Sequence, residues 1–97
     1  MKKKLITTVT GYMTSLYVEL NGLEIGMGYD GIHTYQSTDS VDINSGFLNI
    51  VFQCNGFNGT DWSISISEEA SDKPLFQKKG TITSGNTSII KEQIKIN

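Results

Sequence analysis

Histidine and cysteine each occur once in this chain, as His33 and Cys54, and arginine is absent. A cysteine nucleophile needs a base within hydrogen-bonding reach, so these two residues are the only Cys–His pair that could form a catalytic dyad. Cys54 nevertheless alternates in phase with Ile50 and Phe52, and free cysteine is among the residue types most often buried. We therefore expect Cys54 to lie in a hydrophobic core and the chain not to be an enzyme; a small hydrolase is the weakest of the functions considered.

A weak calcium pattern lies between residues 39 and 46. Asp39, Asp42 and Asn44 place oxygen donors ahead of Gly46, and closely spaced oxygen donors are the ligands that calcium prefers. The full calcium-loop spacing and its terminal bidentate Glu are missing, and Asp and Asn are also common in ordinary turns. A single His and a single Cys do not supply the usual zinc or iron ligands. We expect no cofactor and retain these three residues as the metal candidate.

A glycine pattern at residues 26 to 31 matches a dinucleotide-binding motif by its letters. Gly26, Gly28 and Gly31 have the Gly-x-Gly-x-x-Gly spacing. In that motif a helix N-terminus follows the glycines and directs backbone N–H groups at the pyrophosphate. Here residues 32 to 35 read as a strand, so we interpret the match as accidental.

Aromatic and amide side chains gather in and near the predicted loops, and they form the main binding candidate. Sugar sites on β-sandwiches combine exposed aromatic faces with hydrogen bonds from amides and carboxylates. Phe57, which stands between Asn and Gly residues, is the aromatic residue least easily explained by packing, whereas Trp62 alternates in phase with Ile64 and is expected in the core. The candidate binding residues are Tyr29, His33, Tyr35, Asn55, Phe57, Asn58 and Asp61.

The charge balance excludes some partners. Eight Lys against ten Asp and Glu give a net charge of −2, and the only basic run is Lys2 to Lys4, which we expect to be a solvated tail. Nucleic-acid binders usually present a basic face rich in Arg, so we expect no nucleic-acid partner. No run approaches the roughly 20 apolar residues of a membrane helix. The polar residues after Lys4 do not fit a signal peptide, and a single Cys suits a reducing compartment, so we expect a cytoplasmic location.

Turn signals divide the chain into short alternating runs. Residues 16–20 and 23–25 flank Asn21-Gly22, the strongest short signal for a hairpin with a type I′ turn. Residues 26–29 and 32–36 flank Asp30-Gly31 in the same way, which predicts a meander over residues 15 to 37.

The remaining strands are predicted from alternation of apolar and polar residues. They cover 5–10, 47–54, 62–66, 75–83 and 88–96, with turns at 55–59, 68–74 and 84–86. Residues 37 to 45 read as a polar loop with a short strand at 41–43. No segment has helical periodicity. Seven or eight short strands indicate a single all-β domain over residues 1–97, an antiparallel β-sandwich, with a small β-barrel as the alternative.

These exclusions favour a non-catalytic protein–protein interaction module, either self-associating as a homo-oligomer or serving as a subunit of a bacterial or phage assembly. A lectin-like carbohydrate-binding module is the alternative. Lys78-Lys79 and the run from Lys91 to Lys95 are expected to protect sheet edges from strand addition. Phe47 and Val51 lie on the second face of the central strand and are either covered or part of a partner-binding patch.

Overall fold

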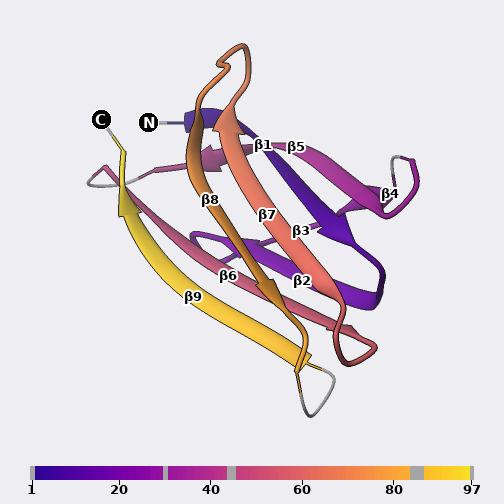
Figure 1. Cartoon of the computed structure of the whole chain (residues 1–97). Coiled ribbons are helices and arrows are strands. Elements are labelled where there is room, and N and C mark those ends of the chain that lie inside the picture. Colours follow the sequence, from indigo (N-terminus) through magenta and orange to yellow (C-terminus); the bar gives the residue numbers. More distant parts are fainter. Residues whose placement is uncertain (1, 30, 44–45, 84–86, 97) are drawn as a thin grey trace.

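The chain folds into two antiparallel sheets that pack face to face (Figure 1). The computed structural model describes residues 2–29, 31–43, 46–83 and 87–96, and these residues form nine strands and no helix. One sheet has the strand order β4-β5-β1-β7-β8 and the other β3-β2-β6-β9. The predicted antiparallel β-sandwich is therefore confirmed. The strands are β1 (Lys2–Gly11), β2 (Met13–Leu20), β3 (Leu23–Ile25), β4 (Gly28–Tyr29), β5 (Thr34–Asp42), β6 (Phe47–Gly56), β7 (Asp61–Glu68), β8 (Pro74–Thr81) and β9 (Thr87–Lys95).

Both predicted hairpins form, but they belong to different sheets. β2 pairs with β3 across Asn21-Gly22, and β4 pairs with β5 on the far side of residues 30–33. The predicted meander over residues 15 to 37 is wrong, because the chain crosses from one sheet to the other between β3 and β4. Turn chemistry fixes only the pairing of neighbouring strands. Each hairpin must still bury its apolar face, and Ile25 from one and Val41 from the other join the same core.

Residues 37 to 42, which were predicted as part of a polar loop, continue the strand that begins at Thr34. β5 pairs with β1 over its whole length, from Thr34 opposite Thr10 to Asp42 opposite Lys2. A strand with one solvated face needs apolar residues only at alternate positions, and in β5 just Val41 is fully buried, at 1% exposed. Because most residues of β5 are polar, its full length was not predicted from the sequence.

The N-terminal lysines are also part of the sheet rather than a solvated tail. Lys2, Lys3 and Lys4 belong to β1. The Lys3 Nζ atom lies 2.9 Å from Glu68 Oε1, and Lys4 Nζ lies 3.7 Å from Glu69 Oε2. The acidic end of β7 thus pairs with the basic start of β1.

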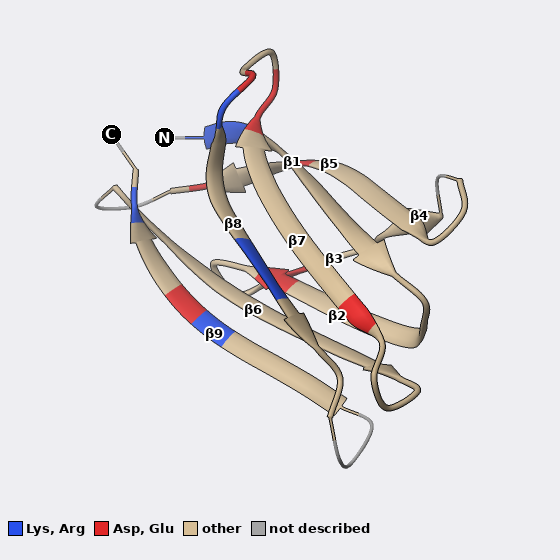
Figure 2. Ribbon diagram, in the orientation of Figure 1, with Lys and Arg blue, Asp and Glu red and all other residues tan. Residues whose placement is uncertain are grey.

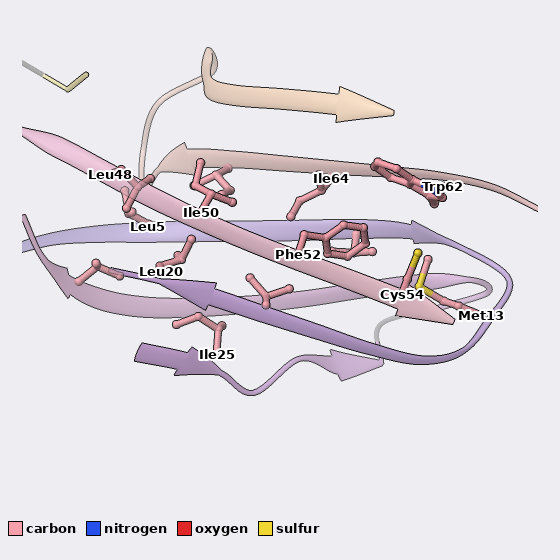
Figure 3. Packing of buried hydrophobic residues seen from close by; sticks show 14 of the residues in the cluster. Leu5, Met13, Leu20, Ile25, Leu48, Ile50, Phe52, Cys54, Trp62 and Ile64 are labelled. Atoms are coloured by element: carbon pink, nitrogen blue, oxygen red, sulfur yellow. The ribbon is translucent and has the colours of Figure 1, made fainter. Parts of the chain in front are cut away.

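The core lies between the sheets, where the alternation predicted it (Figure 3). Ile50, Phe52 and Cys54 of β6 are at most 1% exposed, and Trp62 of β7 is 5% exposed. The rings of Phe52 and Trp62 pack with their centroids 5.2 Å apart. The expectation that Cys54 and Trp62 lie in the core is confirmed.

β8 and β9 are edge strands of the two sheets, and each has a charged residue at a position that faces inward. Lys78 of β8 lies opposite Ile64, and Glu92 of β9 lies opposite Ile50. The Lys78 Nζ atom is 3.0 Å from Glu92 Oε1. Inward charges and edge lysines discourage the addition of a further strand, so these long edges are poor surfaces for a partner.

Asn21 links the β2–β3 turn to the end of β5 and to the start of β6. Its backbone is left-handed, with φ of 50°. Its side-chain Nδ2 donates to the carbonyl of Asp42 at 3.0 Å, and its Oδ1 accepts from the backbone N–H of Asn49 at 2.7 Å.

Replacing Asn21 tests this role. Asn21→Ala loses both hydrogen bonds and strains the left-handed backbone, so we expect the free energy of unfolding to fall by about 2 kcal/mol. Asn21→Gly keeps the backbone geometry and loses only the hydrogen bonds, so the expected loss is about 1 kcal/mol. Urea denaturation measures both values. Equal stabilities for both variants and the wild type would contradict the role assigned to Asn21.

The buried thiol makes stability depend on alkaline pH. Burial raises the pKa of Cys54 from 9.0 to about 11, against a smaller opposite effect of a backbone hydrogen bond at Ser88. The unfolded chain therefore loses this proton before the folded protein does. The contribution of the protonated Cys54 thiol to the stability of the folded protein is complete below pH 9.0 and is lost as the pH rises to about 11.

We expect the free energy of unfolding of the wild type to fall between these two pH values with an added slope of up to about 1.4 kcal/mol per pH unit. Cys54→Ala removes this slope while lowering stability at every pH. Urea denaturation across the range measures it, with Tyr17→Phe as a second variant because the pKa of Tyr17 is also raised. Parallel curves for the wild type and Cys54→Ala would show that the thiol does not carry the effect.

Candidate functional site

Five aromatic rings gather at one end of the sandwich and line a hollow of about 450 Å³ together with Met13 and Thr14. We call this group the aromatic end: Tyr12, Tyr29, His33, Tyr35 and Phe57. Three of these residues are largely exposed to solvent: Tyr12 by 57%, Tyr29 by 62% and Phe57 by 65%. Large aromatic residues normally bury most of their surface, so three such exposed rings in one place mark a candidate binding site.

The crossing from β1 to β2 places Tyr12 at this end. Gly11 has φ of 143°, and a Cβ atom at this position would lie 2.9 Å from the carbonyl oxygen of Asp61. Only glycine combines this backbone conformation with so close an approach. The chain can therefore turn tightly from one sheet to the other, and Tyr12 is left outside the core.

His33 joins the β4–β5 hairpin to this crossing. Its backbone is left-handed, with φ of 58°, a conformation in which His is enriched among non-glycine residues. Its N–H donates to the Tyr29 hydroxyl at 3.1 Å, and its carbonyl accepts from the N–H of Gly11 at 2.8 Å. The imidazole packs against Tyr12 with the ring centroids 4.6 Å apart.

The β6–β7 turn holds Phe57 beside Tyr12. The N–H of Gly59 donates to the carbonyl of Ile82 at 2.7 Å, and the N–H of Ile82 donates to Thr60 at 2.8 Å. The ring centroids of Phe57 and Tyr12 are 6.4 Å apart. Backbone hydrogen bonds thus fix the turn, and the exposed ring is presented on a rigid support.

Four of the seven predicted binding residues come together in the aromatic end, and three lie elsewhere. Tyr29 and Tyr35 pack edge to face with centroids 5.1 Å apart, beside His33 and on the same hollow as Phe57. Asn55 donates from its amide to Ser15 at 2.7 Å and accepts from Thr87 at 2.6 Å. Asp61 accepts a hydrogen bond from the Thr81 hydroxyl at 2.7 Å and lines a different hollow. Asn58 is exposed in the β6–β7 turn and does not line the hollow.

Tyr12 was missed from the sequence. It stands between two strand-like runs, directly after Gly11, and nothing near it in the sequence is aromatic except Tyr17. The available signal was the interruption between the two strand-like runs. A glycine followed by an aromatic residue at such a point indicates that the chain crosses between sheets and that the aromatic side chain belongs to neither sheet.

A second, smaller hollow of about 200 Å³ adjoins the first. Both are lined by Thr14 and Tyr35, and Thr14 lies where the pairing of β2 with β6 shifts its register. Bulges of this kind often occur next to binding sites. We call these two adjoining hollows together the groove; their lining residues extend from the aromatic end along the start of β2 to Glu24.

Glu24, at the far end of this groove, stands opposite a second carboxylate, Glu19, which is not among the residues that line the groove. Glu19 of β2 and Glu24 of β3 are direct cross-strand partners, and we call them the acidic pair. The Tyr17 hydroxyl donates to Glu19 Oε1 at 3.0 Å. This hydrogen bond raises the pKa of Tyr17 above its ordinary 10.0, and burial and the charges of the acidic pair act in the same direction.

The two calcium candidates in the described residues, Asp39 and Asp42, do not converge. Asp39 lies opposite the buried Leu5 and Asp42 lies opposite the exposed Lys2, so the two carboxylates leave β5 on opposite faces. Asp39 accepts a hydrogen bond from the Ser37 hydroxyl. Asn44 lies outside the described residues. Within the part of the chain that the structure describes, no three His, Cys, Asp or Glu residues are grouped to hold a metal ion.

Charge is distributed unevenly along the molecule (Figure 2). Acidic and basic residues crowd the end that holds the start of β1 and the β7–β8 turn. In contrast, the ribbon of the β1–β2 crossing, of β4 and of the β6–β7 turn up to β7 carries no charge among its described residues. The described backbone around the aromatic rings is therefore poor in charge up to Asp61 at the start of β7, whereas the other end of the protein is strongly charged.

Among the described residues there is no helix with the length and hydrophobicity needed to span a membrane. Comparison of the chain with models of protein families, with curated proteins and with solved structures gave no match.

Proposed function

We propose that this chain is a non-catalytic protein-binding module that holds a partner protein at its aromatic end. The observation that carries the proposal is the exposure of Tyr12, Tyr29 and Phe57, at 57%, 62% and 65%, around one hollow of about 450 Å³. Aromatic residues and Met are enriched at protein interfaces, where Lys, Glu and Asp are depleted. The lining of this hollow has that composition.

The way in which the backbone holds the rings of the aromatic end also favours binding. Tyrosines presented on the connections of a β-sandwich offer a large contact area at a low cost in conformational entropy. Here His33 and the β6–β7 turn are each fixed by backbone hydrogen bonds. Rings that are already ordered lose little freedom when a partner docks.

The polar groups around the hollow favour a protein over a sugar. A sugar site needs several amide or carboxylate groups beside the aromatic faces. Asn55 and Asp61, which were expected to supply them, bond instead to Ser15, Thr87 and Thr81. Carbohydrate binding is therefore the second candidate, supported by the exposed rings alone.

Selection from a displayed library of random peptides tests the proposal. The folded wild type is the bait, and the variant Tyr12→Ala/Phe57→Ala, whose folding is checked by thermal unfolding, is the matched control. We expect peptides that bind the wild type and lose at least roughly 30-fold in affinity for the variant. A glycan panel is run in parallel with the same two proteins.

Two outcomes would contradict the proposal. Peptides that bind the variant as tightly as the wild type would show that the aromatic end is not the binding surface. A response of the wild type to glycans that the variant lacks, with no enriched peptides, would replace the protein partner with a carbohydrate.

A further inference from the structure

The groove leading away from the aromatic end has lining residues that suit a cationic ligand. Neither of its two hollows is lined by Lys, and the one carboxylate in their lining is Glu24. The faces of Tyr and Phe rings carry partial negative charge and attract ammonium and guanidinium groups. The ring surfaces and the carboxylate therefore have the same electrostatic preference.

Among the described residues, no cation is paired with the acidic pair. In the described ranges, the ion pairs join Lys3 to Glu68, Lys4 to Glu69 and Lys78 to Glu92, and none includes Glu19 or Glu24. The lysine nearest in register is Lys91, which is separated from Glu19 by Val51 of β6 and so lies about 10 Å away, two strand spacings.

Two like charges directly opposite each other on neighbouring strands destabilise a sheet. Nearby positive charge would remove this cost, and the Tyr17 hydroxyl, a neutral group, supplies the only hydrogen bond to the acidic pair found among the described residues. The pair is thus arranged as an acceptor for a positive group that the described part of the chain does not provide.

We propose that the segment bound at this site is an extended, basic stretch of the partner protein, whose Lys or Arg side chains lie over the rings of the aromatic end, reach Glu24 along the groove and meet Glu19 beside it. This inference rests on the proposed function and specifies the chemistry of the partner. The aromatic end supplies contact area, and the acidic pair supplies the charge complementarity that orients the segment.

The peptides selected on the wild type provide the test. We expect them to be enriched in Lys and Arg relative to the starting library and to bind more weakly as the salt concentration is raised. Glu19→Gln/Glu24→Gln should weaken their binding by about threefold to tenfold. Asp72→Asn, which removes an exposed carboxylate in the charged β7–β8 turn, is the matched control and should leave affinity unchanged.

The outcomes separate this inference from the proposed function. If selected peptides need Tyr12 and Phe57 but show no basic enrichment, or bind the Glu19→Gln/Glu24→Gln variant as tightly as the wild type, the inference is wrong and the protein-binding function stands. Equal weakening by Asp72→Asn would also overturn it, because attraction would then follow net charge rather than the groove. If Tyr12→Ala/Phe57→Ala has no effect, both fail.

Discussion

Phe57→Ala is expected to weaken binding of the selected peptides by roughly 30-fold or more, because a central aromatic residue of an interface commonly contributes at least 2 kcal/mol. The same change should alter the free energy of unfolding by no more than about 0.5 kcal/mol, because the residue is 65% exposed and packs mainly against another exposed ring, that of Tyr12. Fluorescence titration with a labelled selected peptide measures the first effect, and urea denaturation measures the second.

Phe47→Ala is the matched control for this prediction. Phe47 is the first residue of β6, whereas Phe57 directly follows the last residue of that strand, and Phe47 is 39% exposed. Its replacement removes the same ring from a different surface. Equal loss of affinity in the two variants would mean that the partner does not dock on the aromatic end but responds to exposed phenylalanine in general.

Phe52→Ala is expected to have the largest effect on stability, a loss of about 3 to 5 kcal/mol. Phe52 is the largest of the fully buried side chains, at 0% exposed, and its ring packs on Trp62 with centroids 5.2 Å apart. Removing the ring loses its transfer free energy and leaves a cavity between the sheets, where Phe52 lies beside Trp62 (Figure 3). This loss is a large part of the total stability of a small domain.

Because Phe52→Ala can fall below the stability needed for folding, Phe52→Leu is measured beside it. Leu keeps most of the volume and the apolar character, and the expected loss is about 1 kcal/mol. Guanidinium denaturation followed by Trp62 fluorescence reports both variants. A loss below about 1 kcal/mol for Phe52→Ala would contradict the placement of Phe52 at the centre of the core.

The strands of the sandwich could be predicted where apolar and polar residues alternate. Residues 47–54 and 62–66 alternate so regularly that the inward face, including Cys54 and Trp62, follows from the period of two. Asn21-Gly22 predicted its hairpin because few other dipeptides adopt left-handed backbone at both positions, and both do so, with φ of 50° and 83°.

The errors in the fold have a common physical cause, which is that long-range pairing stabilises segments whose local signal is weak. β5 is mostly polar and becomes a strand because β1 pairs with it along its full length. Lys2 to Lys4 extend β1 because they pair with residues 40–42 of β5, and Lys3 and Lys4 also form ion pairs with Glu68 and Glu69. Neither pairing is visible in a window of neighbouring residues.

The candidate site was predicted in part for a similar reason. Tyr29, His33, Tyr35 and Phe57 lie on predicted turns and strand starts, so the sequence could identify them as exposed aromatic residues. The amide and the carboxylate that seemed available were not, because Asn55 and Asp61 form hydrogen bonds with residues far away in sequence. Tyr12 joins the site through the crossing at Gly11, which depends on the close approach of β7.

The most direct test of the central claim is an NMR titration of the labelled protein with a selected peptide. The account predicts that the largest shifts of backbone amides occur at Tyr12, His33, Phe57 and their neighbours, and extend along the start of β2 toward Glu24. Shifts confined to the hydroxyl-bearing outer face of β1 and β7, around Thr8 and Ser65, with none at the aromatic rings, would contradict it.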